Sequence, residues 1–159
     1  MPPCLPRDIQ SRGNGMAARH WSLWLVFNEA RSGGRRMMIE REMAGPGLRT
    51  FFHICEKWRV SPERQVLILR CRDGITLDAW QRGDYAEVSD DVLIRISYVL
   101  GIYKAHHTMF PDERNADGWV TAPNNAPLFA GRSAIELMVE GGVAGLVSVR
   151  SYLDAQLNS

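Results

Sequence analysis

The stretch SDDVLIRISYVLG, residues 89–101, carries the clearest helix signals in the chain. Ser89 is a suitable N-cap, and Asp90 and Asp91 follow it, where the positive end of the helix dipole favours acidic side chains. Gly101 is a residue type at which helices commonly end. Apolar residues recur at helical spacing between these signals, namely Val92, Leu93, Ile96, Val99 and Leu100. The pattern predicts an amphipathic helix that ends at Gly101 and buries this stripe.

Helical spacing of apolar residues recurs along the chain, and no stretch shows convincing strand alternation. Further helices are predicted at 48–58, 62–70, 76–82, 102–110, 133–141 and 143–157. The hydrophobic share of 45% and the charged share of 23% are those of a globular chain, and 159 residues suit one domain or two very small ones that share a core. We therefore expect an all-α protein, a compact helical bundle with a helix-turn-helix and a C-terminal helical hairpin.

The helix-turn-helix is predicted from the spacing of two short helices. Residues 62–70 form the first helix, a turn that contains glycine follows at 71–75, and residues 76–82 form the second helix. The apolar face of the first helix is assigned to Val66, Leu67 and Leu69. Thr76 is the predicted cap of the second helix.

In such a unit the second helix enters the major groove of DNA, and its outward side chains contact bases or phosphates. The outward candidates are Arg72, Thr76, Asp78, Gln81 and Arg82, whereas Leu77 and Trp80 should point inward. Asp78 would repel a phosphate. A plain helical hairpin with a solvated polar face fits the same spacing.

The stretch LFAGRSAIELMVEGGVAGLVSVRSYLDAQ, residues 128–156, is helical in pattern and poor in charge. Ser133 and Glu136 form the S-x-x-E pattern of a capping box, and the glycine pair at 141–142 should break the helix and turn its second part back. The inward residues are expected to be Leu137, Leu146, Val149 and Leu153. The hairpin either completes the core or presents its remaining face to a second protein.

The first 45 residues differ from the rest, because they are rich in Pro, Gly and Arg and show no period. For residues 1–45 we predict either a disordered extension with a short helix near 21–27 or a leader that lies ahead of a true start at Met37, Met38 or Met43. No apolar run approaches the roughly 20 residues of a membrane span. The run WSLWLVF lacks a following cleavage site, so we expect a cytoplasmic protein without membrane contact.

Neither a metal site nor a catalytic set is predicted. The three cysteines, Cys4, Cys55 and Cys71, are widely spaced and indicate reduced thiols. His106 and His107 are adjacent, and adjacent residues of a helix point about 100° apart. No hydrolase, metalloprotease or nucleotide-binding motif occurs. We therefore expect a protein that is not an enzyme and takes no cofactor or metal.

Three stretches, LGIYKAHHTMFPDERNADGWVTAPN, LFAGRSAIELMVEGG and VRSYLDAQ, resemble the Xre-like antitoxins of bacterial RES–Xre type II toxin–antitoxin systems. The resemblance covers roughly residues 47–157. It implies an Xre-like helix-turn-helix domain at 46–120 and an Xre/ParS-type toxin-binding domain at 121–159. It also implies an antitoxin that occludes the active site of a RES toxin, an enzyme that consumes NAD, and that binds the promoter DNA of its own operon as a homodimer.

Residue types and the resemblance together indicate the contacts with the toxin, since Arg and Tyr commonly anchor interfaces. The candidates are Arg132, Ser133, Arg150, Tyr152, Leu153 and Leu157. Ala130 stands where the family often has a second glycine, a change that we expect to matter little. Two alternatives stay open: a stand-alone helix-turn-helix transcriptional regulator without a toxin partner, and a helical interaction module that no longer binds DNA.

Overall fold

The computed structural model describes residues 33–159, and all of its regular structure in that range is helical. The six helices are α2 (Gly33–Lys57), α3 (Pro62–Leu69), α4 (Gly74–Gln81), α5 (Asp90–Met109), α6 (Glu113–Thr121) and α7 (Ala134–Leu157). The all-α prediction is therefore confirmed. The short helix predicted near 21–27 lies outside the described residues.

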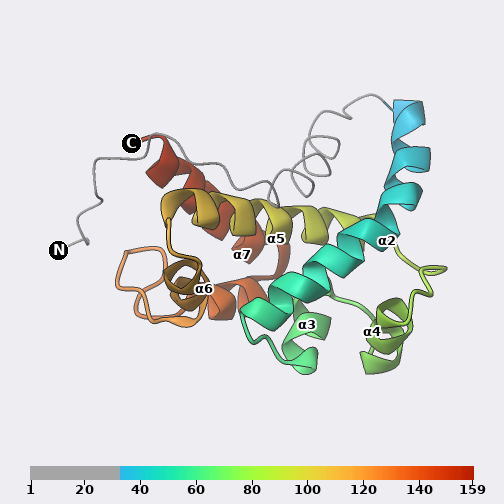
Figure 1. Ribbon diagram of the computed structural model, residues 1–159, viewed down its shortest axis with the longest axis horizontal. Coiled ribbons are helices and arrows are strands. Elements are labelled where there is room, and N and C mark those ends of the chain that lie inside the picture. The colour runs from blue at the N-terminus through green and yellow to red at the C-terminus, as the bar shows by residue number, and fades with distance from the viewer. Residues whose placement is uncertain (1–32) are drawn as a thin grey trace.

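Helix α2 begins at Gly33, inside the segment predicted as an extension, so that residues 33–45 of that segment are helical. The predicted helix at 48–58 therefore begins earlier than expected, and it contains Pro46, a residue type that lacks the N–H used in a helix interior. The helix nevertheless continues through Pro46, and it changes direction between its blue and green parts (Figure 1). Its second part buries Leu48, Phe51 and Ile54.

Helices α3 and α4 form the predicted pair, with two corrections. Leu67 is 44% exposed, and the buried positions of α3 are Gln65, Ile68 and Leu69. Four consecutive apolar residues, VLIL, do not define one apolar face in so short a helix. Packing against α4, α5 and α7 therefore determines which of them are buried.

The cap of α4 is Asp73 and not Thr76. Asp73 Oδ1 accepts hydrogen bonds from the backbone N and the Oγ1 of Thr76, each 2.9 Å long. An aspartate three residues before a threonine can accept bonds from both the backbone N–H and the hydroxyl of that threonine. If Thr76 were the cap, the Asp73 carboxylate would lose these two donors. The helix therefore starts two residues earlier than predicted.

Helix α5 runs on through Gly101 to Met109, so the predicted stop at Gly101 is wrong. The predicted stripe is buried, with exposed fractions of 0–7% for its five residues. Gly101 is itself buried, and Leu100 and Ile102 beside it belong to the core. Packing of both halves offsets the roughly 1 kcal/mol that glycine costs within a helix.

Helices α2 and α7 pack on α5, and α3 and α6 pack on both α5 and α7. A single cluster of buried side chains draws members from each of the helices α2 to α7. Helices α4 and α6 lie at opposite ends of the molecule, and α7 ends near the same side as α6 (Figure 1). No helix in the described range is both long and apolar enough to cross a bilayer.

Candidate functional site

The loop that leads into α7 is fixed by hydrogen bonds to Asn124. The backbone N of Asn124 donates to the carbonyl of Arg132 (3.1 Å), and its carbonyl accepts from the backbone N of Gly131 (2.9 Å). Its side-chain Oδ1 accepts from the N of Ala126 (2.9 Å). Phe129, in the middle of the loop, is fully buried. The loop is therefore a built feature that holds Arg132 at one place on the surface.

Ala130 adopts the left-handed conformation in this loop, with φ of 50°. This region costs most L-residues roughly 1–2 kcal/mol and costs glycine nothing. The expectation that alanine here matters little is therefore wrong, since a glycine would relieve this strain. Gly131, the next residue, has φ of 85°.

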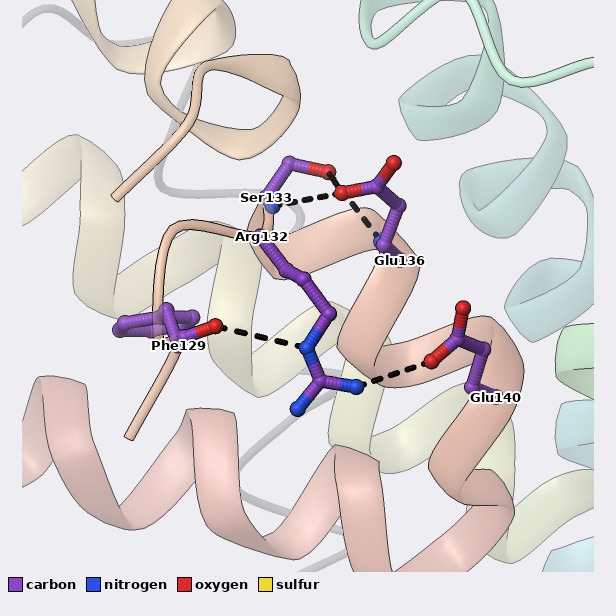
Figure 2. Close-up of polar contacts among 5 residues, drawn as sticks. All are labelled: Phe129, Arg132, Ser133, Glu136 and Glu140. Atoms are coloured by element: carbon purple, nitrogen blue, oxygen red, sulfur yellow. Dashed lines mark hydrogen bonds and ion pairs between the residues drawn. The ribbon is translucent and has the colours of Figure 1, made fainter. Parts of the chain in front are cut away.

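The capping box at the start of α7 is confirmed. Ser133 Oγ accepts from the backbone N of Glu136 (3.3 Å), and Glu136 Oε2 accepts from the backbone N of Ser133 (2.8 Å). Figure 2 shows these bonds beside Arg132. The bonds from Ser133, and secondarily the charges of Arg64 and Arg132, lower the pKa of the Glu136 carboxyl. Ser133 is 4% exposed, so its part in this region is to begin the helix.

Arg132 lies across the first turns of α7. Its Nε donates to the carbonyl of Phe129 (3.4 Å), and its Nη1 pairs with Glu140 Oε2 (2.9 Å) (Figure 2). The side chain is nevertheless 44% exposed, and that of Glu140 is 61% exposed. A guanidinium that is oriented by two contacts and still open to water is suited to bind a carboxylate or a carbonyl of another molecule.

Helix α7 is broken within the glycine pair 141–142, as the sequence predicted, and the break lies at Gly142. Gly142 has φ of 57° and ψ of −136°, which lies outside the helical region, and it separates a first arm, residues 134–141, from a second arm, residues 143–157. A Cβ at Gly145 would overlap the carbonyl oxygen of Leu137. We call the turn made by residues 141–145 the glycine elbow. The second arm can cross the first only because Gly145 has no side chain.

The second arm carries the remaining candidates. Arg150 pairs with Asp154 through Nε at 2.8 and 2.9 Å. The prediction treated the Arg150 side chain as free to dock, whereas it already has this partner. Tyr152 is half-buried, and its ring lies 5.0 Å from that of Phe129. Leu153 is fully buried, whereas Leu157 is 39% exposed. The Phe129–Tyr152 contact joins the loop to the second arm.

A buried histidine that the sequence reading did not assign to this region lies beneath it. The His106 ring is 4.7 Å from Trp119 and 5.6 Å from Phe110, and neither of its nitrogens has a hydrogen-bond partner. Burial, and then the neighbouring His107, lower the pKa of His106 to about 3. His107 Nε2 lies 3.2 Å from Asp117 Oδ1, which ties α5 to α6. His106 is therefore a neutral core residue of an aromatic cluster.

Arg95 is a second residue that the sequence reading missed. Its Nε donates to Asp91 Oδ2 (2.7 Å) and its Nη1 to the carbonyl of Ile68 at the end of α3 (3.4 Å). A Cβ placed at Gly142 would lie 3.9 Å from Arg95 Nη1 and 3.5 Å from Arg70 Nη2. The Arg95 side chain therefore connects α3 and α5 and lies close to the glycine elbow. A basic residue within an apolar stripe could have suggested such a buried contact.

Three of the five helix-turn-helix candidates lie on α4, Arg72 precedes this helix, and Arg82 is its C-cap. The exposed ones are Arg72, Asp78, Gln81 and Arg82, and Thr76 is half-buried against Asp73. Leu77 and Trp80 point into the core as predicted, with exposed fractions of 1% and 3%. Among the side chains that the structure describes, no group of three or more His, Cys, Asp or Glu residues is placed to hold a metal ion.

Comparisons with known proteins address the C-terminal region most directly. Residues 107–157 match the model of the antitoxin Xre/MbcA/ParS C-terminal toxin-binding domain. The uncharacterized protein y4oB of Sinorhizobium fredii (strain NBRC 101917 / NGR234) is 36% identical over 109 residues, which make up 69% of this chain and 82% of that protein. No solved structure matches the chain. The match to the toxin-binding model spans the end of α5, α6, the Asn124–Arg132 loop and α7.

Proposed function

We propose, on the premise that residues 107–157 belong to the antitoxin Xre/MbcA/ParS C-terminal toxin-binding domain family, that the chain neutralises one cognate toxin of the RES type by covering that enzyme's active site. The toxin would otherwise consume NAD. The RES assignment is supported by the resemblance of the Gly131–Arg132–Ser133 turn and the VRSYLDAQ helix to antitoxins of that pairing. Complex formation in the cytoplasm follows from the same proposal.

The observation that carries the proposal is the oriented, half-exposed Arg132 at the start of α7. We assign Tyr152, which is half-buried, and Leu157, which is 39% exposed, to the same contact with the toxin, and we call these three residues the docking surface. Arg150 lies on the second arm with Tyr152 and Leu157, and it would bind a partner while paired with Asp154. Ser133 and Leu153 are buried, so they would act by fixing the positions of these neighbours.

Co-expression with the adjacent toxin gene tests this proposal. Arg132→Glu reverses the charge at the docking surface, so we expect growth to stop and cellular NAD to fall when the variant replaces the wild-type chain. Arg59→Glu makes the same change at an exposed arginine after α2 and should neutralise as wild type does. Full protection by Arg132→Glu, with the toxin active alone, would remove Arg132 from the interface.

We also propose that the α3–α4 unit binds the promoter DNA of its own operon as part of a homodimer. The support is the set of exposed polar and basic residues at the two ends of α4, Arg72 before it and Gln81 and Arg82 at its end. Because α4 and the end of α7 lie at opposite ends of the molecule (Figure 1), one chain could hold DNA and toxin together. In a gel-shift titration with upstream DNA, Arg82→Ala should weaken binding and flatten its salt dependence.

The alternative of a regulator without a toxin predicts the opposite pattern. Such a protein would bind its upstream DNA, and its co-expression would not change the harm done by any neighbouring gene product. The family match over residues 107–157 favours the antitoxin.

A further inference from the structure

Ile75 is the most exposed large apolar side chain among those described. It is 76% exposed, whereas Leu67, Ile94, Leu157 and Val147 are 37–44% exposed. It is the second residue of α4, and the helix start beneath it is fixed by the bonds between Asp73 and Thr76. An isoleucine at this position is therefore held away from the core in a defined direction.

The opposite face of α4 explains why Ile75 cannot turn inward. Leu77 and Trp80 are buried and fix the rotation of the helix on the core. Positions 75 and 78 are three residues apart on α4 and lie on its outward side, and Arg82 caps the helix four residues further on. Ile75 is thus the one large apolar group on this side, beside the exposed Asp78 and Arg82.

The surroundings of Ile75 favour a polyanion over an apolar protein surface. Residues 62–82 expose four arginines, Arg64, Arg70, Arg72 and Arg82, against two acidic residues, Glu63 and Asp78. The hot spot of a protein interface usually groups several large side chains. Here a single apolar group stands among charges, a pattern that suits a major groove lined by phosphates, in which thymine presents a lone methyl group.

We propose that Ile75 contacts the 5-methyl group of a thymine in the major groove and so contributes to the choice of operator. The proposal rests on the DNA binding proposed above for α3 and α4. The Asp73 carboxylate beside it accepts two bonds from Thr76 and caps a helix, which reduces its repulsion of the phosphates.

The test compares upstream DNA of this gene with the same fragment made with uracil in place of thymine, a change that removes only the methyl groups. We expect the wild-type chain to bind the uracil fragment about fourfold more weakly for each methyl contact, the loss typical of one buried methyl group. Ile75→Ala should lose a similar factor on thymine DNA and show no preference between the two fragments. Ile94→Ala, an exposed isoleucine on α5, should keep the wild-type preference.

Each other outcome has a separate meaning. Equal binding of both fragments by the wild-type chain would overturn the thymine contact but leave DNA binding standing. Absence of binding to either fragment would overturn both. If Ile75→Ala instead lowers the molecular mass in solution or frees the toxin, Ile75 belongs to a protein interface and the inference fails.

Discussion

At the scale of single residues, His106 makes the stability of the protein depend on pH. Its ring is completely buried among aromatic side chains, and neither nitrogen has a hydrogen-bond partner. Burial, with a smaller effect of His107, lowers the pKa of the ring from 6.5 to about 3. His106 is therefore protonated below about pH 6.5 in the unfolded chain but only below about pH 3 in the folded chain.

The sign of the effect follows from this difference. The contribution is complete above pH 6.5 and is lost as the pH falls, at up to about 1.4 kcal/mol per pH unit. Between pH 7 and pH 5 we expect urea denaturation to show a fall of roughly 2 kcal/mol in the free energy of unfolding.

His106→Leu is the matched variant, because it keeps an apolar side chain of similar size without a titrating group. Its unfolding free energy should change much less over the same pH range. A wild-type slope as flat as that of the variant would show that His106 is protonated or solvated in the folded chain. The carboxyls with lowered pKa values, those of Glu63, Asp73 and Glu136, titrate below their ordinary values of 3.8–4.5 and so leave this window clear.

At the scale of elements, the glycine elbow decides whether α7 can form two packed arms. Gly145 leaves no room for a side chain, because its Cβ would overlap the backbone oxygen of Leu137. A backbone atom cannot move away as a side chain can. Both arms carry fully buried side chains, Met138 on the first and Leu146 on the second.

Gly145→Ala should therefore destabilise the protein by about 2 kcal/mol or more, in the range of core substitutions that overpack. Gly141→Ala is the control, because its Cβ would meet nothing within 4 Å. It should be neutral or stabilising by about 0.5 kcal/mol, as glycine is a poor helix former. Thermal unfolding of both variants measures the contrast, and equal melting temperatures would mean that the arms do not cross at Gly145.

The elements were largely predictable from the sequence, because caps and apolar spacing are local signals. The capping box of Ser133, the break at the glycine pair and the inward Leu77 and Trp80 all followed from them. Gly101 did not end its helix, because packing against residues distant in sequence stabilises the helix on both sides of it. Local spacing could not show this.

The candidate site was less predictable, since pairing partners and burial arise only in the folded chain. The pair of Arg150 with Asp154 and the burial of Leu153 are examples. One contact of Arg95 joins residues 27 positions apart, so its place within an apolar stripe could suggest burial but could not identify the partner. Ile75 was overlooked for a related reason, because a sequence does not show which apolar residue of a short helix is left exposed.

At the scale of the whole molecule, the regions expected at 46–120 and 121–159 share one core. Helix α7 packs on both α3 and α5, and its Met138, Leu146 and Val149 are fully buried in the common cluster. Removing it would expose the facing residues of α5, among them Ile102, to water.

A chain that ends at Pro127 should therefore lose its cooperative thermal transition and most of its helical circular dichroism. We expect it to lose DNA binding as well, even though α3 and α4 are intact in it. The full-length chain under the same conditions is the reference. A truncated chain that melts cooperatively would show that residues 33–127 form a core of their own.

The position of Arg95 has a consequence for how such proteins can diversify. The Arg95 guanidinium bonds to Asp91 of α5 and to the end of α3 and lies close to the bend in α7, so the regions expected at 46–120 and 121–159 meet in the interior and not only at the segment 121–127. Hybrids spliced at that segment would pair mismatched interiors. New toxin specificities should then arise by substitutions on the outer surface, while exchange of whole modules is disfavoured.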